Sequence, residues 1–209
     1  MLKFYNNREL ARNFQINIAK WKRWSREFLS PDPLGGMQSG YARQYHPDQV
    51  FTVYFGGYLV AHLKFTIPEA KKVLTDLQKW LYANGFCFNG GKTDCKTKLN
   101  EQSGKQYRLF IIRPQSGDHL NGNIQYHIQE IISTHRVQCE GRSIIQEQRV
   151  DSFYNDTKIS NSPAEGTDTS LESAVMINIT GFLRGFVKKL GQDIENYPIL
   201  SPALRGSEI

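Results

Sequence analysis

The sequence predicts an α+β protein, with helices in the N-terminal part and an antiparallel sheet plus a closing helix in the rest. Apolar residues recur at helical spacing up to residue 84, whereas β-branched and aromatic runs bounded by Gly, Asn, Pro or Asp dominate afterwards. The chain has 209 residues and is 39% hydrophobic, which suffices for one large domain or two small ones. We expect two domains, residues 1–84 and 85–209.

Two short helices separated by a tight break are expected first. The first spans 5–15 and the second spans 18–28, with Asn17 available to cap the second. Trp21 and Trp24 fall on one apolar stripe of the second helix, so we expect them to pack in the core. Two helices joined in this way are the layout of a helix-turn-helix. The opposite face of the second helix is basic and carries Lys20, Lys22, Arg23 and Arg26.

The segments that follow combine turn chemistry with one ambiguous run. Residues 30–40 hold two prolines and three glycines, which predicts a loop, and 41–45 then fits a short strand. Residues 50–65 are strongly apolar. The pair Gly56–Gly57 within them fits either the turn of a β-hairpin or a buried helix weakened by two glycines.

A further helix is predicted over 67–82. Thr66 and Glu69 form a capping box ahead of an apolar stripe, and Asn84–Gly85 provides a stop signal. This is the most clearly bounded helix in the sequence.

The second half of the chain reads as strands, a linker and a helix. Strands are predicted over 106–113, 124–132 and 143–153, because these runs are rich in β-branched and aromatic residues. Residues 155–170 are polar and predict a linker. Residues 171–190 predict a helix, whose apolar side would either self-associate or cover the sheet.

Charge is distributed unevenly along the chain, whose formal net charge is +6. Residues 1–50 carry eight Lys or Arg against four Asp or Glu, whereas residues 151–209 carry five against eight. A basic front end suits a protein that meets a polyanion there, and a merely solvated surface is the plain alternative. There is no apolar run of the ~18 residues that a membrane span needs, no secretory leader and no disulfide framework. These features predict a cytoplasmic protein.

Several short motifs occur in one order along the first 80 residues. They are Glu9–Ala11 in the first helix, Ile16-Asn17-Ile18 in the turn, Trp21-Lys22, Trp24 and Arg26–Leu29 in the second helix, then Gly40-Tyr41, Arg43, Tyr45, Pro47 and Asp48, and finally Thr66–Glu69. This series resembles the DNA-binding domain of the MerR family of transcription regulators, over about two-fifths of the chain. The family's order of elements favours a helix over 48–65. Where the family continues into a long dimerising helix, a strand-rich part begins here near residue 85.

The resemblance implies a winged helix-turn-helix over 1–84, with the second helix in the major groove and the wing beside it. Arg can bind guanine through two hydrogen bonds and Lys mostly binds phosphate, so the basic face would supply both base readout and affinity. Free N–H groups at the N-cap can also receive a phosphate. Tyr41 and Tyr45 are expected to brace the wing by packing, with their hydroxyls free for phosphate. The candidate DNA-binding residues are Asn17, Lys20, Lys22, Arg23 and Arg26 in the helix, and Tyr41, Arg43 and Gln44 in the wing.

Other site chemistries find little support in the sequence. Its cysteines and histidines lack metal-ligand spacing, residues 85–92 lack the full phosphate-loop pattern, and no catalytic triad or carboxylate pair stands out. We therefore expect a non-enzymatic, sequence-specific binder of double-stranded DNA, a dimeric transcription regulator without cofactor or metal. Residues 85–209 would dimerise or bind an unknown effector. The alternatives are an architectural or recombination-type DNA factor, and a protein-interaction module or uncharacterised enzyme domain in the C-terminal half.

Overall fold

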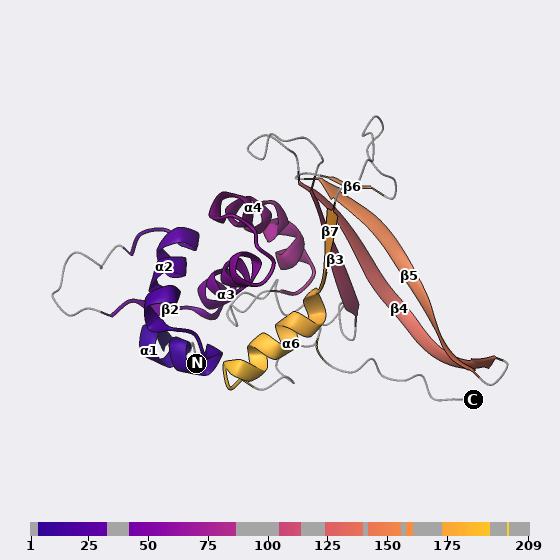
Figure 1. Ribbon diagram of the computed structural model, residues 1–209, viewed down its shortest axis with the longest axis horizontal. Coiled ribbons are helices and arrows are strands. Elements are labelled where there is room, and N and C mark those ends of the chain that lie inside the picture. Colours follow the sequence, from indigo (N-terminus) through magenta and orange to yellow (C-terminus); the bar gives the residue numbers. More distant parts are fainter. Residues whose placement is uncertain are drawn as a thin grey trace. The chain divides into compact units, whose positions relative to one another are not determined.

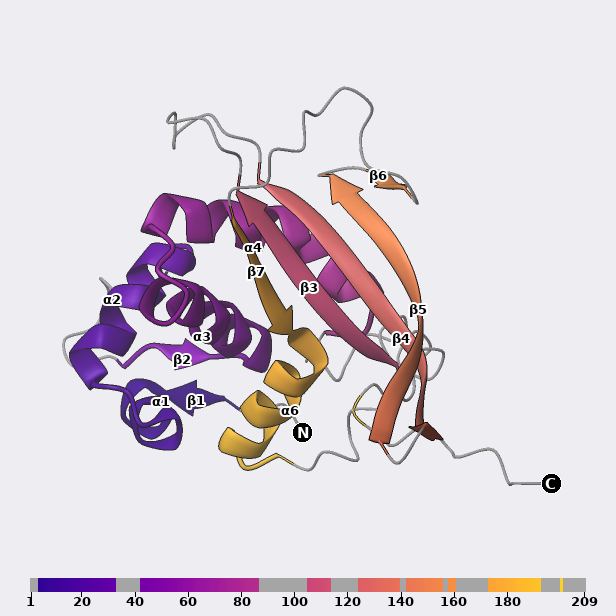
Figure 2. The same ribbon diagram turned by 45° about the vertical axis from the view of Figure 1, so that its right-hand side comes forward.

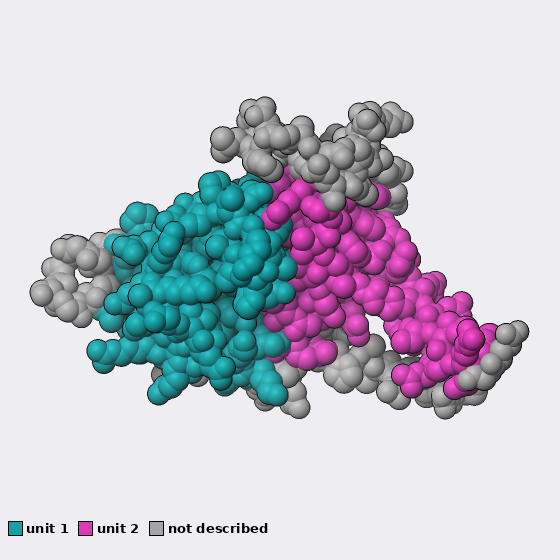
Figure 3. All heavy atoms as spheres, in the orientation of Figure 1, with its two compact units in different colours: residues 1–102, 185–197 teal, residues 103–184, 198–209 magenta. Residues whose placement is uncertain are grey.

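The chain divides into two compact units, which are described separately (Figure 3). The first comprises Met1–Gln102 with Gly185–Tyr197, and the second comprises Ser103–Arg184 with Pro198–Ile209. Helices form most of the first unit and a sheet forms most of the second, which confirms the α+β class (Figure 1). The stretch Gly185–Tyr197 thus groups with the first unit, whereas the sequence suggested one domain over 85–209. The computed structural model describes residues 4–32, 42–86, 105–113, 124–139, 142–155, 158–160, 173–192 and 200.

The N-terminal elements lie close to their expected positions. They are β1 (Tyr5–Asn6), α1 (Asn7–Phe14), α2 (Ile18–Phe28), β2 (Gln44–Tyr45), α3 (Pro47–Ala61) and α4 (Ile67–Ala83). The two short strands pair antiparallel, with Tyr5 opposite Tyr45, so the start of the chain is joined to the segment before α3. Helix α1 begins two residues later than predicted because Asn6 caps it. The Asn6 Oδ1 atom accepts hydrogen bonds of 3.0 Å from the backbone N–H groups of Arg8 and Glu9.

The ambiguous apolar run is a helix, as the order of elements predicted, and its two glycines allow a close helix contact. A Cβ atom added at Gly57 would lie 2.2 Å from the Trp24 ring, and one added at Gly56 would lie 2.8 Å from the Phe28 ring. Both rings belong to α2. The glycines therefore let α2 approach the α3 backbone closely. They serve helix packing and do not form a hairpin turn.

Helix α4 begins at the predicted capping box. The Thr66 Oγ1 atom accepts a hydrogen bond from the backbone N–H of Glu69, while the backbone N–H of Thr66 donates to the Glu69 carboxylate over 2.7 Å. The helix then buries Val73, Leu77 and Trp80 along one stripe. Helix α4 packs against α3 within the first unit.

The last turns of α6 (Ile179–Lys189) complete the core of the first unit. The Phe186 ring centroid lies 5.6 Å from that of Phe14, 5.2 Å from Phe51 and 5.7 Å from Tyr54. Polar contacts follow, because the Lys189 ammonium donates to the Tyr54 hydroxyl over 3.0 Å. Leu183, Phe186, Val187 and Leu190 are buried, so this side of the helix is not an exposed surface for self-association.

The predicted helix over 171–190 is wrong in its first part. Residues Ser173–Asn178 form strand β7, which pairs with β3, and α6 starts only at Ile179. Asn178 marks the change, since its side chain accepts a hydrogen bond of 2.8 Å from the backbone N–H of Gly181. The β-branched content of this stretch and the Asn cap outweigh the helical spacing that led to the prediction.

The second unit is built on a five-stranded antiparallel sheet in the order β6-β5-β4-β3-β7. Its other strands are β3 (Gln106–Arg113), β4 (Gln125–Cys139), β5 (Arg142–Asn155) and β6 (Lys158–Ser160). Strand β3 matches its prediction, with Leu109 and Ile111 buried on one side. Strands β4 and β5 are longer than predicted. Strand β6 lies within the predicted linker over 155–170, so that prediction is wrong at 158–160; most of the linker falls outside the described residues.

Hydropathy within the described helices indicates no membrane span. None of those helices is both long enough and apolar enough to cross a bilayer.

Candidate nucleic-acid interface

Helices α1 and α2 are joined by a turn of three residues. Gln15 adopts a left-handed conformation with φ of 55°, and its backbone N–H bonds to the end of α1. Asn17 then caps α2, because its Oδ1 atom accepts a hydrogen bond of 2.8 Å from the backbone N–H of Ala19. The sequence predicted this cap. Because the Asn17 side chain already caps the helix, Asn17 would contact a ligand chiefly through neighbouring backbone groups.

Helix α2 presents a buried side and a charged side. Trp21 is fully buried and Trp24 is 6% exposed, which confirms the expected core packing of both rings. The Trp21 ring stacks on Phe14 with centroids 5.7 Å apart and meets Tyr45 edge-on at 6.0 Å. The exposed residues of the other side include all four predicted cations, Lys20, Lys22, Arg23 and Arg26.

A buried hydrogen-bond chain fixes strand β2 against both helices. The Tyr45 hydroxyl donates to the Asn7 side-chain oxygen over 2.7 Å and lies 2.8 Å from the Ser25 hydroxyl. Asn7 belongs to α1 and Ser25 to α2, so one tyrosine links three elements. Tyr45 is 1% exposed, so it packs as predicted, but the prediction that its hydroxyl is free for a phosphate is wrong, because the hydroxyl is buried and bonded to Asn7 and Ser25. The position of residues 42–44 beside α2 is thereby determined by the core.

The three predicted wing residues have different outcomes. The Arg43 guanidinium donates to the carbonyl oxygen of Ser30 over 2.9 Å and lies 5.4 Å from the Tyr45 ring centroid. Arg43 therefore fixes the residues that directly follow α2. Gln44 is exposed at the strand. Tyr41 lies outside the described residues. Arg43 therefore contributes charge at the surface while also fixing the local structure.

Two shallow hollows join the charged side of α2 to β2. Lys22 lines both of them. One hollow also takes in Arg8 of α1 and Gln44, and the other takes in Arg26 and Arg43. Sequence reasoning missed Arg8, because only folding brings it to the same hollow as Lys22. Cations from α1, α2 and the segment before β2 therefore line neighbouring hollows of the first unit.

Cations outnumber carboxylates along the two hollows, where Asp32 is the one acidic residue among the described lining residues, beside Arg8, Lys22, Arg26 and Arg43. Lys20 lies 5.0 Å from the Trp24 ring centroid, a cation–π contact that leaves its charge in place. The acidic residue of this helix, Glu27, pairs instead with Lys71 of α4 over 3.0 Å. The surface therefore keeps a positive potential that an anion can use.

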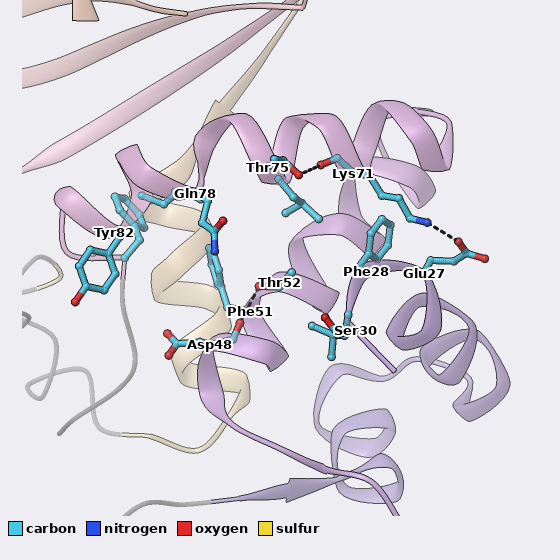
Figure 4. A pocket seen from close by; sticks show the side chains of 14 residues that line it. Glu27, Phe28, Ser30, Asp48, Phe51, Thr52, Lys71, Thr75, Gln78 and Tyr82 are labelled. Atoms are coloured by element: carbon cyan, nitrogen blue, oxygen red, sulfur yellow. Dashed lines mark hydrogen bonds and ion pairs between the residues drawn. The ribbon is translucent and has the colours of Figure 1, made fainter. Parts of the chain in front are cut away.

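A groove on another part of the first unit has different chemistry (Figure 4). It lies between the end of α2, the start of α3 and α4, and its walls include Phe28, Phe51 and Leu81. Among the described residues that line it, Lys71 is the one cation and is already paired with Glu27. This groove therefore lacks the charge that a polyanion requires.

The described residues contain no group of three or more His, Cys, Asp or Glu placed to hold a metal ion. Cys87 and Cys95 lie outside the described residues, and Cys139 is an exposed free thiol. No family model, curated protein or solved structure matches the chain. The assignment of a function therefore depends on the arrangement of the first unit itself.

Proposed function

We propose that the first unit binds double-stranded DNA through α2, in the manner of a MerR-like winged helix-turn-helix, and that the protein is a sequence-specific transcription regulator. The observation that carries this proposal is that Lys22 and Arg26 of α2 line two hollows together with Arg8 and Arg43. Arg23 is a further exposed cation of the same helix. Residues 85–209 would then form or support the part that dimerises or receives an effector.

The dimensions of α2 suit a major groove. Its 11 residues give a length of about 16 Å, and the groove of B-DNA is about 12 Å wide. Trp21 and Trp24 hold the helix on its scaffold, so the cations can enter a groove without unfolding their support. We assign base readout to Arg23 and phosphate contact to Lys22, because of the chemistry of their side chains.

The test begins with selection from a random duplex library, followed by salt titration of the selected sites. We expect a palindromic motif, and an affinity that falls steeply between about 50 and 300 mM salt because phosphate contacts release counterions. Lys22→Ala should reduce the slope of log affinity against log salt by ~0.9 at all sites. Arg23→Ala should cost ~1–3 kcal/mol and relax the preference at one base pair.

Lys79→Ala is the matched control, since Lys79 is an exposed lysine of the same unit on α4. It removes one positive charge without touching α2, and DNA affinity should remain close to that of the parent chain. Unchanged binding in both Lys22→Ala and Arg23→Ala would disprove α2 as the recognition helix. Salt-sensitive binding without a motif would favour an architectural DNA factor, and no binding at low salt would remove the DNA proposal.

A further inference from the structure

The groove between the end of α2, the start of α3 and α4 has the size of a small-molecule site (Figure 4). We call it the α2–α4 groove. Its volume is about 720 Å³, and binding sites for small molecules typically measure ~300–1,000 Å³. Its described lining residues all belong to the first unit, so the packing of that unit alone determines the shape of the groove.

Apolar side chains form much of the wall of the α2–α4 groove. They are Phe28, Leu29, Phe51, Leu74, Leu81 and Phe86. Phe51, Leu81 and Phe86 are each at most 7% exposed, so core packing holds these walls in place. The Phe51 ring centroid, for example, lies 5.8 Å from that of Phe55 and 5.2 Å from that of Phe186. An apolar ligand can therefore leave water for a surface that is already formed.

The charged residues of the groove favour a cation. Among the described lining residues, Glu27 and Asp48 are carboxylates and Lys71 is the one ammonium group, so their net charge is −1. Lys71 pairs with Glu27 over 3.0 Å at one end of the groove. Asp48 lies in the first turn of α3, where a helix stabilises a carboxylate. A ligand of positive charge is attracted to this lining, whereas an anion is repelled.

Four aromatic rings share the groove with these carboxylates. They belong to Phe28 of α2, Phe51 of α3, Tyr82 of α4 and Phe86, which follows α4. The faces of such rings attract organic cations, most strongly where water is excluded. A hard inorganic cation would instead need several oxygen ligands, and the described residues contain no cluster of three or more His, Cys, Asp or Glu suited to a metal. Aromatic walls with an excess of carboxylate thus favour an organic cation.

We propose that the α2–α4 groove binds a small organic cation with apolar substituents, with Asp48 as its counter-ion and the aromatic rings as its walls. Glu27 and Phe28 line the groove, so the bound cation would touch the last turn of α2 directly. The volume of the groove suits a compact molecule and is too small for a protein surface. The inference stands apart from DNA binding, because it is measured without any nucleic acid.

The experiment uses two ions of similar shape and opposite charge, tetraphenylphosphonium and tetraphenylborate. Isothermal titration calorimetry on the full chain gives the Kd of each. We expect tetraphenylphosphonium to bind one site with a Kd on the order of 10 µM, an affinity within reach of a ligand of this size. Tetraphenylborate should bind roughly tenfold or more weakly. This preference runs against the net charge of +6 on the chain, so general electrostatic attraction would not produce it.

Three variants test where tetraphenylphosphonium binds. Asp48→Asn keeps the shape of the side chain and removes its charge, so it should raise the Kd about fivefold or more. Glu9→Gln is the matched control, because Glu9 also lies in the first turn of a helix of this unit but does not line the groove. It should leave the Kd within about twofold. Gln78→Trp should abolish binding, because it fills the groove from an exposed position on α4.

Several outcomes would overturn the proposal. One is the absence of tetraphenylphosphonium binding up to about 1 mM, and another is an equal affinity for the two ions. A Kd that Asp48→Asn leaves unchanged, or that Glu9→Gln raises equally, would show that the charge of Asp48 has no special role. Undiminished binding by Gln78→Trp would place the bound ion elsewhere. Far-UV circular dichroism and urea unfolding should confirm that each variant folds as the parent chain does.

Discussion

Helix α2 and the outer part of the β4–β5 hairpin are both exposed, but the chain supports them differently. We call this outer part, residues 133–139 and 142–148, the arm; it extends past the rest of the sheet (Figure 2). Helix α2 packs on α1 and α3, buries both of its tryptophans and presents its cations on the remaining side. Beyond Ile131 the backbone of the arm pairs only with itself among the described strands, and the arm exposes Val137, Ile144 and Ile145. One surface is a charged face on a packed support, and the other is a two-stranded ribbon that Arg108 of β3 holds at its base through Glu147.

The difference shows that exposure alone does not identify a partner. A solvated lysine or a single exposed isoleucine is ordinary on a protein surface. What distinguishes α2 is that cations from α1, α2 and the segment before β2 line two hollows in which Asp32 is the one acidic residue among those described. What distinguishes the arm is that apolar residues share one face and that face holds no charge at its centre.

The largest expected effect separates the two sides of α2. Trp21→Ala should lower the free energy of unfolding by ~3–5 kcal/mol, because the ring is fully buried between Phe14 and Tyr45. Lys22→Ala, at the next residue on the exposed side, should change it by less than ~0.5 kcal/mol. Urea unfolding followed by far-UV circular dichroism measures both. A Trp21→Ala variant as stable as the parent chain would contradict the packing described here.

The second prediction concerns the contact that supports α2 from behind. Gly57→Ala should destabilise the protein by ~1–3 kcal/mol, since the added Cβ would lie 2.2 Å from the buried Trp24 ring. Gly185→Ala in α6 is the matched control, because nothing lies within 4 Å of its added Cβ. There the change should instead stabilise the helix by ~0.5–1 kcal/mol. Thermal unfolding of the two variants would test the contrast, and equal shifts would refute it.

Local patterns predicted much of the first unit. The bounds of α2, the capping box of α4 and the burial of Trp21 and Trp24 follow from spacing and caps within one helix. The predicted cations of α2 are exposed for the same reason, since a buried stripe leaves its opposite face in solvent. Whether those residues bind DNA remains a prediction.

The features that escaped sequence reasoning depend on contacts between distant segments. The glycines of α3 are explained by rings on α2, and Phe186 finds its neighbours more than 100 residues away in the chain. Strand β7 was taken for helix because its partner, β3, lies far away in the sequence. The length of the arm was missed because its polar stretches resemble turn sequence. Arg8 was missed because its proximity to Lys22 arises from folding.

The smallest effect is a test of how the base of the arm is held. Arg108 of β3 reaches the arm and binds both carboxylate oxygens of Glu147 over 2.6 Å. That hydrogen-bonded pairing holds the pKa of the Glu147 carboxyl below its usual range. Because the folded-state pKa is the lower one, the pairing stabilises the fold above the unfolded pKa of about 4.3, and the contribution is lost as pH falls through the folded value.

Glu147→Gln should therefore reduce the steepness with which stability falls below about pH 4.5, while leaving the remaining carboxylates to titrate as before. Urea midpoints measured from neutral to acidic pH would show the flatter profile. Arg108→Ala should flatten the profile to the same extent, and the double variant should flatten it no further, because the two groups act through one interaction. Additive effects of the two changes would mean that Glu147 is held by something other than Arg108. In that case the base of the arm would not be fixed to β3, and the contrast between the packed helix α2 and the exposed arm would be greater.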